Sequence, residues 1–260
     1  MKSDLLWRVG LLATAGLFLW ILHRYVGAYP PALPRSKHPS ANVRMALSLA
    51  GIAISLSVLK VLWISPWLVR AISDPSLREL VQVPLWSIPY LLLPVWLVTR
   101  KMKWGAADIG LLFANQSWDA TIFAIVFGLA SGCVAYFTGQ SNISIQMLPL
   151  GALLVLFYNN AFLEEFYHRG VIQSLFERAI GQRKAILWGG ILFGLTHITL
   201  DLSALLETEG FIAVFSALVL QTMAGWMFGI IYVKTRSLWP GIVCHYLANW
   251  LPSILVAGLG

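Results

Sequence analysis

The sequence predicts an all-α, polytopic membrane protein built as a bundle of about eight transmembrane helices. Of its 260 residues, 58% are hydrophobic and only 11% are charged, whereas soluble domains carry about 25% charged residues. Its 12 tryptophans fit the aromatic belts that form where a membrane meets water. The chain is long enough for one compact bundle, so we expect a single integral-membrane domain over residues 1–260.

Apolar stretches of membrane-spanning length recur along the whole chain. A spanning helix needs about 20 mostly apolar residues, and about 17 are enough. Eight stretches qualify, at 5–22, 45–64, 83–98, 118–137, 147–166, 185–200, 211–233 and 238–256. Pro84, Pro89 and Pro94 predict kinks in the third stretch, and the fifth is expected to continue as a more polar helix through Phe176. The mixed segment 65–81 predicts a helix lying in the membrane interface.

The positions of lysine and arginine predict how the bundle is oriented. Thirteen of the 18 basic residues fall at the loops that follow the odd-numbered helices. The positive-inside rule assigns those loops to the cytoplasm and both termini to the other side. The net charge of +7 is therefore explained by topology, and no basic segment interleaved with aromatic residues suggests nucleic-acid binding. The lipid bilayer is therefore an expected partner.

Polar residues within the predicted transmembrane helices are the candidate functional groups. They are Glu164, Glu165, His197, His245 and Asn249. A charge at bilayer depth costs roughly 2.5 to 17 kcal/mol, depending on the method, so such a residue is a functional hypothesis by default. On a helix, Glu165 and Arg169 share a face, while Glu164 lies about 100° away from Glu165. Glu165 is therefore expected to pair with Arg169, which leaves Glu164 free to face the centre of the bundle.

These groups together suit the hydrolysis of a peptide bond without a covalent intermediate. A carboxylate such as Glu164 can act as a general base on water, and His197 can orient the same water. His245 and Asn249 lie four residues apart on one face and can donate hydrogen bonds to an oxyanion. His168 is a further titratable group, four residues after Glu164, to which the sequence assigns no role.

Three spaced motifs carry a resemblance to a known family. They are Glu164-Glu165-x-x-x-Arg169, Phe193-x-x-x-His197 and His245-x-x-x-Asn249. Their order and their placement on the fifth, sixth and eighth helices resemble the CPBP family, which comprises the CAAX proteases and bacteriocin-processing enzymes and is also called Abi. The segment 237–245 resembles the usual entry into the last motif. The motifs lie between Phe162 and Asn249, within an expected catalytic core at about 147–257.

The resemblance implies a glutamate-type intramembrane protease whose catalytic groups lie in a cavity open to the cytoplasm. It implies that Glu164 activates the water with help from His197, and that His245 and Asn249 stabilise the oxyanion. No cofactor is implied. The substrate class would be a membrane-associated protein that is prenylated or carries a leader, because eukaryotic members remove the last three residues of prenylated CAAX proteins.

The resemblance also implies supporting roles for Glu165, Arg169 and Phe193. The expected location is the plasma membrane of a prokaryote, as a multi-pass protein with its active site facing the cytoplasm.

Two other interpretations of the same residues remain open at this point. Glu164, His197 and His245 could bind zinc in a membrane metalloprotease, since two imidazoles and a carboxylate are competent ligands. The common zinc-protease spacing His-Glu-x-x-His is missing from the sequence. The protein could instead be a non-catalytic immunity or regulatory protein of the same fold, in which the polar cluster holds the bundle together.

Overall fold

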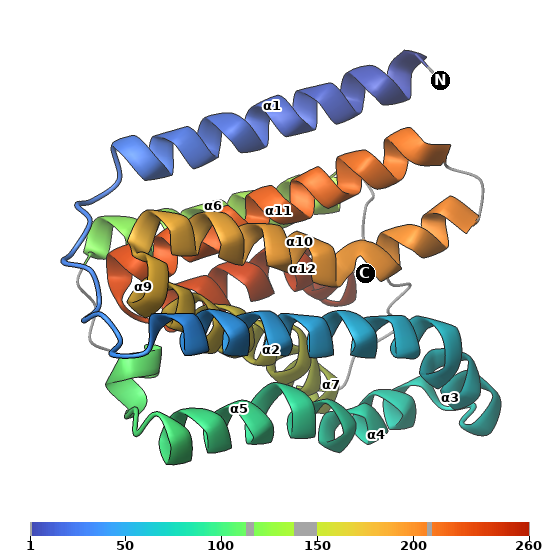
Figure 1. Cartoon of the computed structure of the whole chain (residues 1–260). Helices are drawn as coiled ribbons and strands as arrows, with labels where there is room; N and C mark the ends of the chain where they lie inside the picture. Colours follow the sequence, from blue (N-terminus) through green and yellow to red (C-terminus); the bar gives the residue numbers. More distant parts are fainter. Residues whose placement is uncertain (1, 113–116, 138–149, 207–209, 260) are drawn as a thin grey trace.

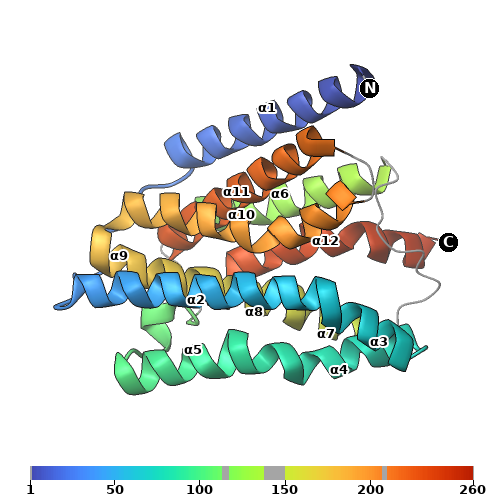
Figure 2. The ribbon, with the colours of Figure 1, turned by 45° about the vertical axis from the view of Figure 1, so that its right-hand side comes forward.

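Helices form all the regular structure in the computed structural model, which describes residues 2–112, 117–137, 150–206 and 210–259. Each of the eight apolar stretches corresponds to one helical rod, in the expected order, so the prediction of an all-α membrane bundle is confirmed (Figure 1). The rods run roughly parallel and antiparallel to one another, and α1 lies at one side of the bundle (Figures 1 and 2).

Five rods are single helices: α1 (Lys2–Arg24), α6 (Trp118–Phe137), α10 (Gln182–Leu206), α11 (Gly210–Thr235) and α12 (Trp239–Leu259). The second rod is α2 (Pro39–Leu59), η1 (Lys60–Ile64) and α3 (Ser65–Ala71). The third is α4 (Pro75–Ser87), η2 (Ile88–Leu92), α5 (Leu93–Trp96) and η3 (Leu97–Lys101), followed by the short turn η4 (Ala106–Ile109). The fifth is α7 (Leu150–Leu156), η5 (Phe157–Phe162), α8 (Leu163–Glu165), η6 (Phe166–Gln173) and α9 (Ser174–Ile180).

Several described helices are long and apolar enough to cross a membrane. By length and composition these are Pro39–Ala71, Leu80–Lys101, Trp118–Phe137 and Gly210–Thr235, and Val9–Arg24 is a shorter apolar helix. Large apolar side chains such as Trp63, Phe137 and Phe211 are exposed on the outside of the bundle. Exposed apolar surface on this scale is typical of helices that face lipid.

The segment 65–81, expected to form one interfacial helix, is divided between two helices. Residues 65–71 continue the second rod as α3, and α4 belongs to the third rod, so that only a short connection separates the two. Ile72 is extended, with φ −131° and ψ 110°, and Pro75 disfavours a helical conformation at the residue before it. The prolines expected to kink the third rod lie in an unbroken helix that includes the π-helical segments η2 and η3, wider turns that accommodate local distortion.

Close contacts at glycine hold the later helices together. A Cβ atom on Gly225 of α11 would lie 2.7 Å from the Cα of Gly190 on α10, and one on Gly128 of α6 would lie 2.8 Å from the carbonyl oxygen of Cys244 on α12. Helices α10 and α11 accordingly lie side by side in both views (Figures 1 and 2). Small residues at these positions let the backbones approach, as is usual in membrane bundles.

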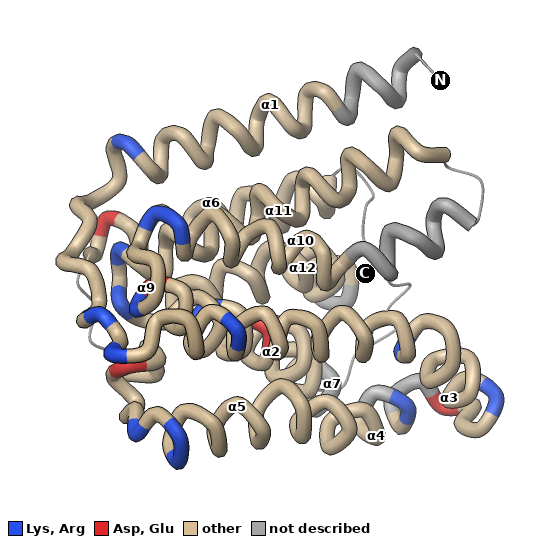
Figure 3. Tube along the Cα trace, in the orientation of Figure 1, with Lys and Arg blue, Asp and Glu red and all other residues tan. Residues whose placement is uncertain are grey.

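Basic residues gather at one end of the bundle, where α1 ends, α2 begins and α9 lies (Figure 3). At this end Lys234 of α11 is completely buried and closes the C-terminus of α1. Its Nζ donates to the carbonyl oxygens of Leu22, Val26 and Gly27 at 2.8, 2.6 and 2.9 Å, and lies 3.3 Å from that of His23. One ammonium group therefore satisfies helix-end carbonyls that would otherwise lack donors.

Candidate active site

The fifth rod is unusually wound where the candidate residues lie. Two π-helical segments, η5 and η6, flank the short α8, which carries Glu164 and Glu165. Such wide turns are rare and are frequent at functional sites. The rod crosses the interior of the bundle, and all eight residues of η6 are buried.

Glu164 faces two histidines from two other helices. Its Oε2 lies 3.6 Å from Nε2 of His197 on α10 and 3.8 Å from Nε2 of His245 on α12. Both distances exceed that of a direct hydrogen bond, and this Oε2 is buried with no hydrogen-bond partner among the described residues. The carboxylate thus meets both imidazoles but is free to bind another group.

Glu165 has the opposite surroundings and is fully engaged with protein groups. Its Oε1 accepts a hydrogen bond from Nη1 of Arg169 at 3.1 Å and lies 3.1 Å from Nδ1 of His245. Arg169 also donates from Nη2 to the carbonyl oxygen of Gly225 at 3.2 Å. The pair is almost inaccessible to solvent, so Glu165 and Arg169 form the ion pair expected from their spacing and also orient His245.

Phe193 of α10 organises the other side of the cluster. Its carbonyl oxygen lies 2.9 Å from Nδ1 of His197, and because a carbonyl only accepts, that nitrogen carries the proton. Its ring lies 4.2 Å from the guanidinium carbon of Arg169 and 4.5 Å from the centroid of the His197 ring. Phe193 therefore fixes the tautomer of His197, so that Nε2 is directed at Glu164.

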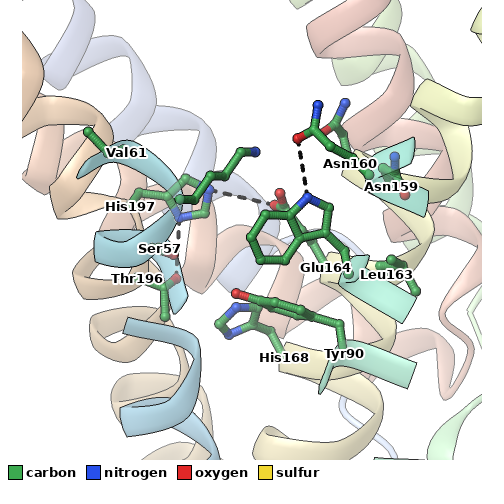
Figure 4. A pocket seen from close by; sticks show the side chains of 13 residues that line it. Ser57, Val61, Tyr90, Asn159, Asn160, Leu163, Glu164, His168, Thr196 and His197 are labelled. Atoms are coloured by element: carbon green, nitrogen blue, oxygen red, sulfur yellow. Dashed lines mark hydrogen bonds and ion pairs between the residues drawn. The ribbon is translucent and has the colours of Figure 1, made fainter. Parts of the chain in front are cut away.

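A cavity of about 110 Å³ adjoins Glu164 and His197 (Figure 4). Water needs only about 10–15 Å³ of such volume, so the cavity has room for several molecules. Its walls come from four rods and are formed by Ser57, Lys60, Val61, Gln82, Trp86, Tyr90, Asn159, Asn160, Leu163, Glu164, His168, Thr196 and His197.

Many residues of this cavity wall were not predicted from the sequence. The first half of the chain was expected to add helices but no functional residue, yet Ser57, Lys60 and Gln82 line the cavity. The Nζ of Lys60 lies 5.4 Å from the centre of the Trp86 ring, which is also part of the cavity wall. A polar side chain on an otherwise apolar helix could have indicated these cavity residues. Lys60, Gln82 and the Asn159-Asn160 pair all show this pattern.

Besides Glu164, two cavity residues have buried polar atoms to which no described residue hydrogen-bonds. They are Nδ1 of His168 and Oδ1 of Asn159. Buried polar atoms are nearly always paired with protein or water, so each such atom needs an explanation. Here both residues line the cavity, so water or a substrate can supply the missing partner.

Asn249 does not join the other candidates. It lies one helical turn after His245 on α12 and is exposed, whereas His245 is buried; neither residue is part of the cavity wall. The spacing correctly placed both residues on one helix, but the helix presents only His245 to Glu164. The structure therefore places His245, but not Asn249, beside Glu164.

The described residues contain no group of three or more His, Cys, Asp or Glu side chains arranged to hold a metal ion. The trio expected for zinc, Glu164, His197 and His245, does converge, at the distances given above. Two of its members have their Nδ1 atoms bonded to protein acceptors, which leaves Nε2 of each imidazole directed at the carboxylate.

The described residues thus form an all-α bundle in which a carboxylate and two imidazoles from three helices meet in the interior. Residues 145–251 match the family model described as Type II CAAX prenyl endopeptidase Rce1-like. The match covers less than half of the chain but includes all three motifs, so the resemblance to the CAAX proteases of the CPBP family is confirmed. At the level of the family, the chain is similar to membrane peptidases. No curated protein and no solved structure matches the chain.

Proposed function

We propose that the protein is an intramembrane endopeptidase in which Glu164 and His197 activate a water molecule. The observation that carries the proposal is the convergence of two imidazole Nε2 atoms on the Oε2 of Glu164, at 3.6 and 3.8 Å. That oxygen has no direct hydrogen bond among the described residues, and Glu164 lines a cavity large enough for water.

The separation of Glu164 and His197 suits a water shared between them. Two acceptors 3.6 Å apart can both receive a hydrogen from one water oxygen at about 2.8 Å from each. The lone pairs of that oxygen then point away from both acceptors. In the proposed reaction the water oxygen bonds to the scissile carbonyl carbon and its proton passes to Glu164. Glu164 then delivers the proton to the departing amine nitrogen as the C–N bond breaks.

His245 is the proposed stabiliser of the developing oxyanion. Glu165 accepts from its Nδ1, and in its protonated form the imidazole can donate from Nε2. Asn249, exposed on the next turn, is assigned no contact with the oxyanion in this proposal. We expect Asn249→Ala to keep most of the activity and His245→Ala to lose it.

We further propose that the substrate is a membrane-associated protein or peptide, prenylated or carrying a leader, that enters between the helices lining the cavity. By the positive-inside rule, the basic end of the bundle lies in the cytoplasm of a prokaryotic cell with the site accessible from that side. No resident cofactor is required.

The central test compares wild-type protein with Glu164→Gln and His197→Ala in cells and after purification. New protein termini in membranes from cells expressing each form are identified by mass spectrometry. We expect cleavage to fall by about 10²–10⁴-fold in both variants, the usual effect of losing a general base. Asp119→Asn and His23→Ala, which lie outside the cavity wall, are the controls and should cleave normally. Normal processing by both site variants would contradict the proposal.

Chelator treatment distinguishes the zinc alternative. The purified wild-type protein is dialysed against a metal chelator, its metal content is measured, and cleavage is assayed before and after adding zinc. We expect activity to survive without metal. Activity that is lost with the chelator and restored by zinc would instead support metal-assisted hydrolysis through the same three side chains.

A further inference from the structure

A second cavity, of about 370 Å³, lies at the basic end of the bundle where α2 begins, away from Glu164. It is formed by the loop before α2, the first turns of α2, the end of the third rod and α9. Its lining residues are Pro34, Arg35, Ser36, Lys37, His38, Ala41, Asn42, Met45, Lys101, Met102, Trp104 and Arg178. None of them lines the candidate active site.

The charge in this cavity is of one sign. Arg35, Lys37, Lys101 and Arg178 line it, and no Asp or Glu does so among the described residues. Within the part of the chain that the structure describes, Arg35, Lys37 and Lys101 have no carboxylate at ion-pair distance. Like charges brought together without counter-ions destabilise a fold unless an anion occupies the space between them.

Arg178 contributes a buried donor that is not used. Only 9% of the residue is exposed, its Nη2 donates to Asp108, and its guanidinium carbon lies 4.6 Å from the ring of Trp104. Its Nε is buried and has no hydrogen-bond partner among the described residues. These contacts hold the side chain in place at the cavity wall and leave one of its donors without a partner among the described residues.

The N-terminus of α2 adds to the same electropositive region. His38 precedes the helix, makes no side-chain hydrogen bond to it, and no acidic residue lies in the first turn. The free N–H groups and the helix dipole therefore favour an anion here. Met45, Met102 and Trp104 supply an apolar wall beside the charges.

The loop that carries Arg35 and Lys37 is fixed in place. The backbone N–H of Ser36 donates to the carbonyl oxygen of Arg178 at 2.9 Å, and that of Leu33 donates to Oε1 of Glu177 at 2.9 Å. Arg236 donates to the carbonyl oxygen of Pro31 at 2.8 Å. The basic side chains are thus presented by a fixed backbone, which lowers the entropy lost when a ligand binds.

We infer that this cavity binds a phosphate-bearing anion, presented by the headgroup of an anionic phospholipid. Clustered Lys and Arg with a neighbouring Trp are suited to the headgroup region of a membrane. Arginine and lysine can both bind phosphate oxygens, and Arg178 is held at the cavity wall with one donor unpaired among the described residues. The same chemistry would accept free phosphate, which the experiment separates from the lipid.

The test measures thermal unfolding of the full-length protein in neutral detergent while lipid is added. Phosphatidylglycerol, phosphatidylcholine and inorganic phosphate are titrated separately into wild type and into Arg35→Gln/Lys37→Gln/Lys101→Gln. The matched control, Arg44→Gln/Arg100→Gln/Lys184→Gln, removes the same charge from exposed positions near the start of α2, the end of η3 and the start of α10, outside the cavity lining. We expect phosphatidylglycerol to stabilise wild type and the control, and its apparent affinity to fall roughly tenfold or more in the cavity variant.

Each outcome bears on the inference. Stabilisation by phosphatidylglycerol alone identifies the lipid headgroup, and equal stabilisation by inorganic phosphate supports a phosphate site filled from solution. Equal stabilisation by phosphatidylcholine would overturn the inference, because no net negative charge would then be needed. An equal loss in the control variant would also overturn it, because diffuse attraction rather than this cavity would explain the binding.

Discussion

Glu164 and Glu165 are neighbours in sequence but have opposite environments. Glu165 bonds to Arg169 and His245 in the interior, whereas Oε2 of Glu164 lies near two imidazoles without a hydrogen bond among the described residues. A carboxylate bonded to its neighbours supports structure, and one left free at a cavity can take part in chemistry. The two residues should therefore respond differently to substitution.

Arg169→Gln should destabilise the protein strongly, because it leaves the Glu165 charge buried without its ion-pair partner. Breaking a buried pair costs about 3–5 kcal/mol. Glu164→Gln should change the free energy of unfolding far less, because its Oε2 has no hydrogen bond to lose among the described residues. Denaturant unfolding of both variants in detergent measures the contrast, and similar losses in the two would contradict it.

His168 should affect activity and stability in opposite directions. Its Nδ1 is buried without a hydrogen-bond partner among the described residues, and the side chain lines the cavity. His168→Phe removes that unpaired group, so we expect unchanged or higher thermal stability. Cleavage should fall by a few-fold to about tenfold, the value of one hydrogen bond to substrate or water. A variant that cleaves at the wild-type rate would show that His168 contacts neither.

At the scale of elements, the contact between α10 and α11 positions the active site. Gly225 lies against Gly190, and its carbonyl oxygen accepts from Arg169. A side chain at Gly225 would separate the two helices and move the acceptor that holds the guanidinium. The packing of two glycines is thus connected to the orientation of His245 through Arg169 and Glu165.

Gly225→Ala should cost about 1–3 kcal/mol of unfolding free energy, because overpacking forces the backbones apart. Gly51→Ala is the matched control, since a Cβ there meets no atom within 4 Å. Replacing this helical glycine should stabilise the protein by about 0.5–1 kcal/mol. Thermal unfolding of the two variants tests the difference, and a neutral Gly225→Ala would show that the contact is looser than the structure indicates.

In the fifth rod, some features could be predicted from the sequence and others could not. Apolar length predicted the rod, and the spacing of Glu165 and Arg169 predicted their ion pair, because both follow from regular helix geometry. The π-helical segments η5 and η6 were not foreseen. Side chains of the rod bond to other helices within these segments, as Gln173 of η6 does to the carbonyl oxygen of Gly229, and such contacts are not visible in the local sequence.

At the scale of the whole molecule, the order of the eight rods was predicted from hydropathy alone, and all of them formed. The composition of the cavity was not predictable, because Ser57, Gln82 and Tyr90 are far from the motifs in sequence. Only the three-dimensional arrangement brings them to Glu164. The exposure of Asn249 was not predictable for the same reason, since spacing fixes a helix face but not what that face contacts.

The orientation of the molecule can be tested by cysteine labelling. After both native cysteines are replaced, single cysteines at Ser36 and at Ser73 should label from opposite sides of the membrane, because the two lie at opposite ends of the second rod. The positive-inside rule predicts Ser36 in the cytoplasm. If a membrane-impermeant reagent added to intact cells labels the cysteine at position 36, the predicted cytoplasmic location of this end is wrong.

The surroundings of the Lys234 ammonium group predict that the stability of a Lys234 variant depends on the cation in the buffer. Its ammonium group is surrounded by carbonyl oxygens of residues 22, 23, 26 and 27, the kind of oxygen ring that replaces the water shell of a potassium ion in a channel filter. Lys234→Ala should leave that ring empty and loosen α1, and potassium chloride should restore thermal stability better than a tetramethylammonium salt of equal ionic strength. The lysine is in this sense a tethered counterpart of an alkali metal ion, and it adds one buried positive charge to the apolar contacts of Leu22 and Phe18 that also attach the first helix.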